Sequence, residues 1–419
     1  MKIAVYGTTL HAGVMASLFA EYGHQVFWCQ YPTDKDFCSV VYQDKAVNEL
    51  INKQMVRKNL HICSACDVSV AVDTYFFAFN SHEYALAQYV LKDIQNKPVI
   101  HPKLMINGSS FGLEGTKKLQ ALATKDDWCY LPDTIQEGNT LDSVTKVEHI
   151  VIGVDGDAAK QKIKEVLRPF YHANHHYLFM PILDAEFTKL SVSGMLATRI
   201  SYMNDLAQVA EKLNIDIANV RLGLGADSRI GSAYIAPGVG FGGENFSQDI
   251  LTLTQTIEET GIKSDLLEQV WAINEQQKEL LFRKLWQYYQ CDLKGKVVAI
   301  WGASFKENTP RINFSPIHTM LEALWAQGVT VQLHDPEALP LIAKKYGSRE
   351  DLVLCESRYE AVENADALCL LTAWKQYLSL DYTRLHQLMK HPLILDGRNV
   401  YDAAYVKSQG FAYEGVGRI

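Results

Sequence analysis

The chain has 419 residues, of which 48% are hydrophobic and 21% are charged, and its formal net charge is -8. A chain of this length exceeds what one hydrophobic core usually serves, so we expect two or three domains. The acidic balance, without a dominant basic region, argues against binding to the phosphate backbone of nucleic acid.

The first twenty residues allow two interpretations. Lys2 precedes an uncharged run, as in a secretory signal peptide, but His11 interrupts the run and Glu21 follows it. We favour a strand and a helix of a folded domain, and we expect no membrane-spanning segment. Eight cysteines scattered through a large chain are typical of reduced thiols, so we expect a cytoplasmic protein. The pair Cys63 and Cys66 lacks a second pair, so we expect no metal site.

Strand and helix patterns alternate in the first part of the chain. Residues 2–6 form an apolar run rich in β formers, and a glycine-containing turn at 7–13, an amphipathic stretch and a second strand at 25–29 follow. This order is the βαβ unit of a parallel sheet. Further apolar runs that we interpret as strands lie at 68–72, 98–102 and 149–154.

The pattern becomes helical in the middle of the chain and returns to strands near residue 296. Apolar residues recur at helical spacing from 184 to about 212 and from 250 to about 289, with a weak point at Gly261. We therefore predict an α/β protein with two Rossmann-like doubly wound parallel-sheet domains joined by a central helical domain. The expected domains are residues 1–183, 184–292 and 293–419.

Many short motifs occur in one order along the chain. Together they resemble the UDP-glucose/GDP-mannose dehydrogenase family over essentially the whole length. The motifs are Pro132-Asp133, Glu137-Gly138 with Asp142, Phe187–Leu190, Leu196–Ser201 with Asn204, Gly225–Gly231, Pro237–Gly243, Phe305-Lys306 with Thr309, Ser315-Pro316, His334–Pro336 and Asp396–Asn399.

The resemblance implies a specific enzyme organisation. Members of the family bind NAD on the first domain and a nucleotide sugar on the third, and they dimerise about the central helices. They oxidise the sugar C6 alcohol twice, through an aldehyde and a cysteine thioester, to a carboxylate. This chemistry needs a thiolate to capture the aldehyde, an ammonium and an amide to stabilise the oxyanion, and carboxylates to manage a water.

The catalytic positions that the resemblance implies are partly substituted. Asn245 stands where the nucleophilic cysteine should be, and a carboxamide has no accessible anionic form near neutral pH. Ser193 replaces the oxyanion amide, and Gln248 replaces a lysine. The remaining implied catalytic residues are Lys189, Asp249 and Asp133, the last as a shortened version of a glutamate.

The cofactor positions also depart from the family pattern. Thr9 and Ala12 stand where the phosphate turn should have its second and third glycines, so a branched side chain reaches the expected pyrophosphate position. Gln30 replaces the acid that holds the ribose, and it lacks the charge of a carboxylate. Divergent turns do bind dinucleotides, so NAD binding stays open, and we expect no other cofactor. The other implied cofactor residues are Gly7, Leu10, Thr74 and Glu137.

The nucleotide-sugar positions depart less. A UDP-sugar is the ligand that the resemblance favours, and Arg229 matches an arginine that reaches the site of a neighbouring subunit. The run at 310–314 departs from the family, which puts the contacts of that run in doubt. The other implied substrate residues are Lys189, Phe241, Gly242, Gly243, Phe305, Lys306 and Arg398.

Two groups outside these motifs have alternative interpretations. Cys129 precedes the Pro132-Asp133 motif and could be a relocated nucleophile, but a buried structural cysteine is the commoner case. His172, His175 and His176 could bind a metal, but we favour a solvated linker.

Three functions follow from these observations. The first, which we favour on the sequence alone, is a protein that binds a nucleotide sugar but has lost the complete oxidation to the uronate. The second is an active NAD-dependent UDP-sugar oxidoreductase that stops at the C6 aldehyde or finishes through a hydrate. The third is a structural or regulatory partner of an active paralogue. We expect a homodimer through the central helices.

Overall fold

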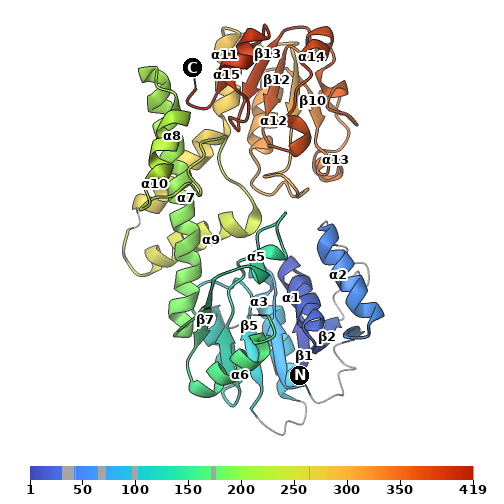
Figure 1. Cartoon of the computed structure of the whole chain (residues 1–419), viewed down its shortest axis with the longest axis vertical. Coiled ribbons are helices and arrows are strands. Elements are labelled where there is room, and N and C mark those ends of the chain that lie inside the picture. Colours follow the sequence, from blue (N-terminus) through green and yellow to red (C-terminus); the bar gives the residue numbers. More distant parts are fainter. Residues whose placement is uncertain are drawn as a thin grey trace. The chain divides into compact units, whose positions relative to one another are not determined.

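The computed structural model describes residues 1–30, 42, 44–64, 72–96, 102–170, 176–263 and 265–418. The chain forms two compact units, unit 1 (Met1–Ser191) and unit 2 (Val192–Ile419). Unit 1 is blue to green in Figure 1, and unit 2 is green to red. The expected strands at 68–72 and 98–102 lie almost wholly outside the described residues.

Unit 1 is built on an eight-stranded sheet in the order β3-β2-β1-β4-β5-β6-β7-β8. The first six strands in this order are parallel and have the arrangement of dinucleotide-binding folds. β7 runs antiparallel to β6, so the sheet is not wholly parallel as predicted. The strands are β1 (Lys2–Tyr6), β2 (Gln25–Gln30), β3 (Leu60–Ser64), β4 (Thr74–Phe77), β5 (Leu104–Asn107), β6 (Asp127–Tyr130), β7 (His149–Val154) and β8 (His176–Met180). The predicted strands at 2–6, 25–29 and 149–154 are confirmed.

Helices cover both faces of this sheet. One face packs against α1, α2 and α6, whose buried residues join one apolar cluster around Phe19 and Phe76. The other face packs against α3, α4 and the start of α7, in a cluster that holds Phe77 and Trp128. The helices are α1 (Leu10–Glu21), α2 (Lys45–Val56), α3 (Tyr84–Gln95), α4 (Gly115–Gln120), α5 (Asp142–Thr145), α6 (Asp157–Leu167) and α7 (Ile182–Leu213).

The predicted helical region is confirmed, with different boundaries. α7 has 32 residues and contains the boundary between the two units. The apolar pattern at 250–289 is divided among three helices, and the first ends beside Gly261, whose φ of 80° is left-handed. The helices of this part are α8 (Ile217–Ala226), α9 (Glu244–Glu259), α10 (Asp265–Lys278) and α11 (Leu280–Tyr288).

Unit 2 closes with a six-stranded parallel sheet in the order β11-β10-β9-β12-β13-β14, which repeats the strand order of the first six strands of unit 1. Helices again pack on both faces. The α/β fold with a central helical region is thus confirmed, and the division into three domains stays a prediction. The elements are β9 (Val297–Trp301), α12 (Pro316–Ala326), β10 (Thr330–His334), α13 (Leu339–Tyr346), β11 (Leu352–Leu354), β12 (Ala367–Leu370), α14 (Tyr382–Leu388), β13 (Leu393–Asp396), α15 (Ala403–Ser408) and β14 (Ala412–Gly415).

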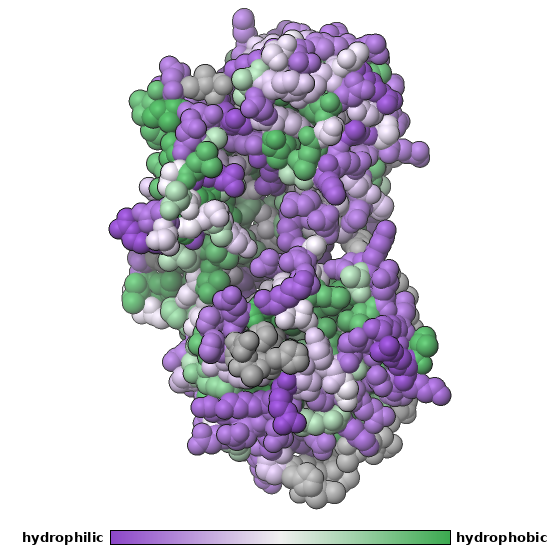
Figure 2. All heavy atoms as spheres, in the orientation of Figure 1, coloured by the Kyte–Doolittle hydropathy of each residue, from purple (hydrophilic) through white to green (hydrophobic). Residues whose placement is uncertain are grey.

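The face of the surface drawn in Figure 2 is mainly hydrophilic, as the share of hydrophobic and charged residues in the sequence predicts. Among the described residues, no helix combines the length and the hydropathy that a membrane span requires.

A glycine stands at the point of each sheet where the strand order reverses. Gly7 follows β1 with a φ of 117°, and a Cβ there would lie 2.0 Å from the carbonyl oxygen of Ala78, after β4. Gly302 follows β9 with a φ of 99°, and a Cβ there would lie 2.5 Å from Cβ of Thr372, after β12. Neither position accepts a side chain, and both lie at the carboxyl edge where open parallel sheets bind ligands.

Asp335, after β10, organises the carboxyl edge of the second sheet. Its Oδ2 accepts hydrogen bonds from the backbone N–H groups of Ala303 and Ser304, from Ser304 Oγ and from Trp374 Nε1. Its Oδ1 accepts hydrogen bonds from the N–H groups of Glu337 and Ala338. One buried carboxylate therefore fixes the loops that follow β9, β10 and β12.

We predict that Asp335→Ala destabilises unit 2 by at least about 3 kcal/mol, because it leaves several buried donors without an acceptor. Hydrogen exchange of the β9 and β10 peptides in the full chain measures this change. The matched control is Glu350→Ala, which removes an exposed carboxylate from the same unit and should leave exchange unchanged. Equal protection in Asp335→Ala and Glu350→Ala would contradict the assignment.

Candidate functional site

The turn after β1 is held by aromatic side chains. Trp28 Nε1 donates to the carbonyl oxygen of Gly7 at 2.9 Å, and Tyr42 Oη donates to the carbonyl oxygen of Thr9 at 2.8 Å. The Tyr42 ring covers Gly13 of α1, where a Cβ would lie 2.2 Å from the ring. The turn is therefore fixed before any ligand arrives.

Thr9, predicted to crowd the pyrophosphate, caps α1. Its Oγ1 donates to the carbonyl oxygen of Ala78 at 2.8 Å and accepts a hydrogen bond from the N–H of Ala12 at 3.1 Å. The cap uses one first-turn donor that an anion could otherwise bind. The N–H groups of Leu10 and His11 have no acceptor within the helix, so these two remain available.

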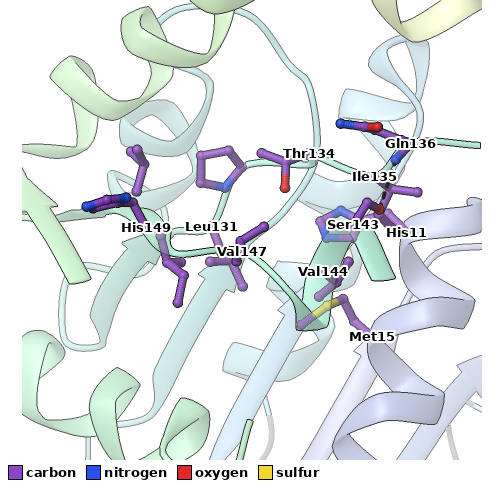
Figure 3. A pocket seen from close by; sticks show the side chains of 13 residues that line it. His11, Met15, Leu131, Thr134, Ile135, Gln136, Ser143, Val144, Val147 and His149 are labelled. Carbon is purple, nitrogen blue, oxygen red and sulfur yellow. Dashed lines mark hydrogen bonds between the residues drawn. The ribbon is translucent and has the colours of Figure 1, made fainter. Parts of the chain in front are cut away.

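His11 lines a cavity of about 190 Å³ at the same edge of unit 1. Its ring is buried edge-on against Phe76, and its Nδ1 is 3.0 Å from the carbonyl oxygen of Gly108. Because a carbonyl oxygen only accepts, Nδ1 is the donor in this hydrogen bond. Figure 3 shows His11 and Met15, from α1, facing the loop that carries Thr134 to Gln136.

The other predicted cofactor residues separate into two groups. Asp133 and Glu137 lie in the loop between β6 and α5, and Asp133 Oδ1 accepts the N–H of Ile135 at 3.0 Å. This loop leaves the carboxyl end of β6, the edge that also carries Gly7. Thr74 begins β4 opposite Ile3, at the amino end of the sheet, so the structure does not bring it to this edge. The backbone of Gln30 ends β2, and its side chain lies outside the described residues.

Lys189 is buried in α7 within unit 1. Its Nζ donates to Ser110 Oγ at 3.1 Å. Glu186, one turn earlier, accepts the N–H of Thr116 at 2.8 Å through Oε1. Burial raises the pKa of Glu186, against hydrogen bonds from Thr116 and the charge of Lys117.

The glycine loop (Pro237–Gly243) of unit 2 is held from one side by polar side chains. Asn274 in α10 accepts the N–H of Phe241 through Oδ1 at 2.7 Å and donates to its carbonyl oxygen through Nδ2 at 3.2 Å. Gln277 donates to the carbonyl oxygen of Gly238, and Asn204 in α7 accepts the Gly238 N–H. The backbone N–H and C=O groups of Gly238 and Phe241 are thereby hydrogen-bonded to side chains, although this loop belongs to no sheet.

The other side of the glycine loop packs on the loop that follows β9. A Cβ on Gly242 would lie 2.6 Å from the carbonyl oxygen of Phe314, and one on Gly243 would lie 2.7 Å from the Phe305 ring. The N–H of Gly243 donates to the carbonyl oxygen of Asn313 at 2.9 Å. Phe314 has a φ of 56°, which is strained for a bulky residue. The predicted substrate residues Phe241, Gly242, Gly243 and Phe305 thus form one packed group.

Arg398, after β13, joins the same group. Its Nε donates to the carbonyl oxygen of Leu371 at 2.6 Å, and its Nη2 donates to the carbonyl oxygen of Phe305 at 3.2 Å. Burial lowers the pKa of Arg398, while the carboxylates of Glu307 and Asp396 oppose this shift. Lys306 lies 5.6 Å from the Phe305 ring, so two cations flank this edge of the sheet.

The substituted run at 310–314 borders a second cavity. The cavity measures about 290 Å³ and is lined by Ile312, Asn313, Phe314, His318 and Lys345. Burial, with a smaller effect of Lys345, lowers the pKa of His318 to about 4. His318 is therefore neutral near pH 7, and Lys345 supplies the positive charge.

Asn245 lies on the exposed first turn of α9, just after the glycine loop. Asp249, one turn later in α9, is buried, and its Oδ2 accepts a hydrogen bond from Ser193 Oγ at 2.8 Å. Ser193 follows Lys189 by four residues in α7, and residues at this spacing lie on one face of a helix. Arg229, by contrast, is exposed beyond α8 and pairs with Asp227 at 2.6 Å.

Two cysteines of the described part, Cys129 and Cys369, are too deeply buried to act as nucleophiles. Cys129 is fully buried in β6, and burial raises its thiol pKa far above the ordinary value, which supports the structural interpretation. Cys369 is equally buried in β12. His172 and His175 lie outside the described residues, and His176 begins β8. Within the described residues, no group of three histidine, cysteine or acidic side chains is arranged to hold a metal.

Two family models match the chain. Residues 183–276 match the central domain of the UDP-glucose/GDP-mannose dehydrogenase family, and residues 299–403 match its UDP binding domain. The second range contains Gly302, Phe305 and Arg398, which lie at the carboxyl edge of the second sheet. The chain belongs to the UDP-glucose/GDP-mannose dehydrogenase family.

Individual relatives agree with this family. A UDP-glucose 6-dehydrogenase of Pseudomonas aeruginosa is 38% identical over 290 residues, which cover 68% of this chain and 64% of that relative. Another, of Rhizobium meliloti, is 29% identical over 100% of both chains. The structure of a UDP-glucose dehydrogenase from Pyrobaculum islandicum superposes with a TM-score of 0.88, at 25% identity, over 100% of this chain and 98% of the other.

Sequence reasoning missed several residues that build this dehydrogenase-family site. Asn274 and Gln277 hold the glycine loop, and Tyr42 holds the phosphate turn. The only sequence signal for Asn274 was a polar residue inside an apolar helical pattern. Tyr42 gave no signal, because its contacts with Thr9 and Gly13 join segments about thirty residues apart.

We predict that Gly242→Ala weakens UDP-sugar binding at least about tenfold, because the new Cβ meets the backbone of Phe314, which cannot rotate away. Calorimetric titration with UDP-glucose measures the affinity. The matched control is Gly223→Ala in α8, where a Cβ meets nothing within 4 Å. If both variants bind equally well, the glycine loop does not shape the site.

Proposed function

We propose that the protein is an NAD-dependent oxidoreductase that oxidises the C6 alcohol of a UDP-sugar and stops at the aldehyde. The observation that carries this proposal is the packed group formed by the glycine loop, Phe305 and Arg398. Gly242 and Gly243 let the backbone of the glycine loop approach Phe305 and Phe314 closely, where a side chain would not fit. The relatives named UDP-glucose 6-dehydrogenase support UDP-glucose as the first substrate to test.

The carboxyl edge of the sheet in unit 1 fits a dinucleotide, although it offers the pyrophosphate fewer backbone N–H donors than a glycine-rich turn would. Gly7 leaves room beside Ala78, and α1 offers the N–H groups of Leu10 and His11 to a pyrophosphate. Gln30 ends β2, where a side chain can hydrogen-bond a ribose. We infer that NAD binds here, although Thr9 uses one N–H group for itself.

The proposed reaction needs a hydride acceptor and a base. When bound, NAD supplies the hydride acceptor. Lys189, buried beside Ser110, and Asp249, buried beside Ser193, are the side chains that we propose to orient the C6 hydroxyl and take its proton. These residues are common to the family pattern and to this chain.

The proposed end point follows from position 245. A thioester requires a thiolate at the aldehyde carbon, and the Asn245 carboxamide has none. The buried thiol of Cys129 has a raised pKa and cannot take over this role. The product is therefore the aldehyde, in equilibrium with its hydrate, rather than a uronate formed through an enzyme-bound acyl group.

The test mixes the full chain with UDP-glucose, NAD and hydroxylamine, which traps the aldehyde and draws the equilibrium forward. We expect one reduced cofactor for each sugar consumed, and the oxime as the product in mass spectrometry. Two reduced cofactors with uronate would contradict the proposed end point. If the protein binds the sugar but no reduced cofactor forms, it is a nucleotide-sugar-binding protein without this activity, and the proposed activity is contradicted.

A matched pair of variants checks the sugar half of the same assay. We predict that Arg398→Ala raises the KM for UDP-glucose about tenfold or more, because a partly buried charged donor is lost. Lys407→Ala removes an exposed cation from α15 and should leave KM unchanged. Equal KM values in the two variants would remove Arg398 from the site.

We also propose that the chain forms a homodimer through the central helices. The face of α7 in unit 2 carries Met195, Tyr202, Val209 and Leu213, whose large apolar side chains are between 49% and 63% exposed. Their spacing of seven, seven and four residues puts them on one side of the helix. Leu222 of α8 is 73% exposed, and apolar residues gather over α8 in Figure 2. A contiguous apolar surface of this kind is typical of an interface.

The exposure of these side chains gives a direct test. We predict that the double variant Met195→Glu/Tyr202→Glu shifts the full chain from dimer to monomer in light scattering, because two charges per subunit would be buried in the interface. Val353→Glu, at a partly exposed apolar position of β11, is the matched control and should remain a dimer. A wild-type monomer at assay concentration would refute the interface.

A further inference from the structure

Two cysteines face each other at the carboxyl end of β2 and β3. β2 and β3 pair in parallel, and Cys29 is the direct partner of Cys63. Their sulfur atoms are 3.7 Å apart, and neither sulfur is in a disulfide. Cys29 is buried in the apolar cluster under α3, whereas Cys63 is partly exposed.

The backbone already has the spacing that a disulfide requires. Neighbouring strands lie about 4.8 Å apart, and disulfides accept Cα separations of about 4.4–6.8 Å. The two sulfurs need only approach from 3.7 Å to bonding distance of about 2 Å by side-chain rotation. The present thiols instead donate weakly to backbone carbonyl groups, Cys29 to Phe27 and Cys63 to Trp28.

Access favours Cys63 as the first thiol to react. β3 is the last strand in the sheet order on its side, so Cys63 lies on an edge strand. Oxidation of cysteine follows exposure and thiolate character. Cys29, at 2% exposure, is reached only through the neighbouring sulfur.

We propose that Cys29 and Cys63 form a reversible disulfide, a redox modification site at the cofactor edge of unit 1. The Cys63 thiolate attacks one oxygen of hydrogen peroxide, which breaks the O–O bond, forms a sulfenic acid and releases water after protonation. The Cys29 thiolate then attacks the Cys63 sulfur, and the second water leaves. In total, two thiols and one peroxide give one disulfide and two waters, and an external dithiol reverses the reaction.

The site has a consequence for the cofactor, and this part rests on the proposed function. Gln30 follows Cys29 directly and pairs with Ser64, the residue after Cys63. The covalent link would join the two strands directly before the segment that carries the proposed ribose contact, and it would restrain the adjustment of that segment to a ribose. We expect the disulfide to weaken NAD binding about fivefold, the effect of losing one modest hydrogen bond.

Peptide mapping of the full chain tests the disulfide itself. After a small excess of hydrogen peroxide, blocking of free thiols and digestion, we expect the peptide that holds Cys29 to be joined to the peptide that holds Cys63. Dithiothreitol should separate them. The link should persist in Cys291→Ser, which removes an exposed thiol elsewhere, and in Cys66→Ser. It should be absent in Cys29→Ser and Cys63→Ser.

Two results would overturn the modification site. One is a link of Cys63 to Cys66 instead of Cys29, and the other is oxidation of Cys63 to the sulfinic acid without any link. NAD titration before and after oxidation tests the coupling separately. An unchanged affinity in a linked protein that does bind NAD would overturn the coupling alone, whereas absence of NAD binding even in the reduced protein would contradict the proposed function and leave the disulfide standing.

Discussion

The close approach of one backbone to another at glycine positions is the constraint on which both ligand edges depend. At Gly7 and Gly302 a strand leaves its sheet directly beside the neighbouring loop, and a side chain would overlap atoms 2.0–2.5 Å away. At Gly242 the loop of unit 2 passes against the backbone of Phe314 in the same manner. A larger residue at any of these positions would have to move the neighbouring backbone or side chain.

The chain uses one strand order twice, once in each unit. In both sheets the strand order reverses beside a glycine with a positive φ, next to Ala78 in unit 1 and next to Thr372 in unit 2. Within unit 1, Lys189 is buried beside Ser110. Within unit 2, Asp249 is buried beside Ser193. Each of these polar contacts is made inside its own unit.

The side chains at the positions where the resemblance implies substitutions fit their local structure. Ser193, where the resemblance implies an amide, makes a hydrogen bond to Asp249 inside unit 2. Thr9, where the resemblance implies a glycine, caps α1 and occupies the N–H of Ala12. Asn245 lies on the exposed first turn of α9, which begins at Glu244. The effect of these three residues on reactivity stays a prediction.

The sequence determined the fold class, several strands and the ordered motifs, because period-two and helical patterns are local signals that survive without tertiary context. The runs at 2–6 and 149–154 are strands as predicted, and the helix expected from 184 to about 212 spans Ile182–Leu213. The motifs predicted which residues form the cofactor and substrate sites, and these assignments stay predictions, except that the structure places Thr74 away from the cofactor edge. It did not show that β7 runs antiparallel to β6, because strand direction follows from packing.

Only the tertiary structure decided what each side chain touches. Thr9 turns inward to Ala78, Tyr42 covers Gly13, and Asn274 holds Phe241, and all of these contacts join residues far apart in the chain. Thr74 lies at the amino end of β4, away from the cofactor edge, and the sequence pattern did not predict this position either. Local sequence fixes the preference of a segment for helix or strand, whereas the partner of a buried polar group depends on which distant segment the fold brings beside it.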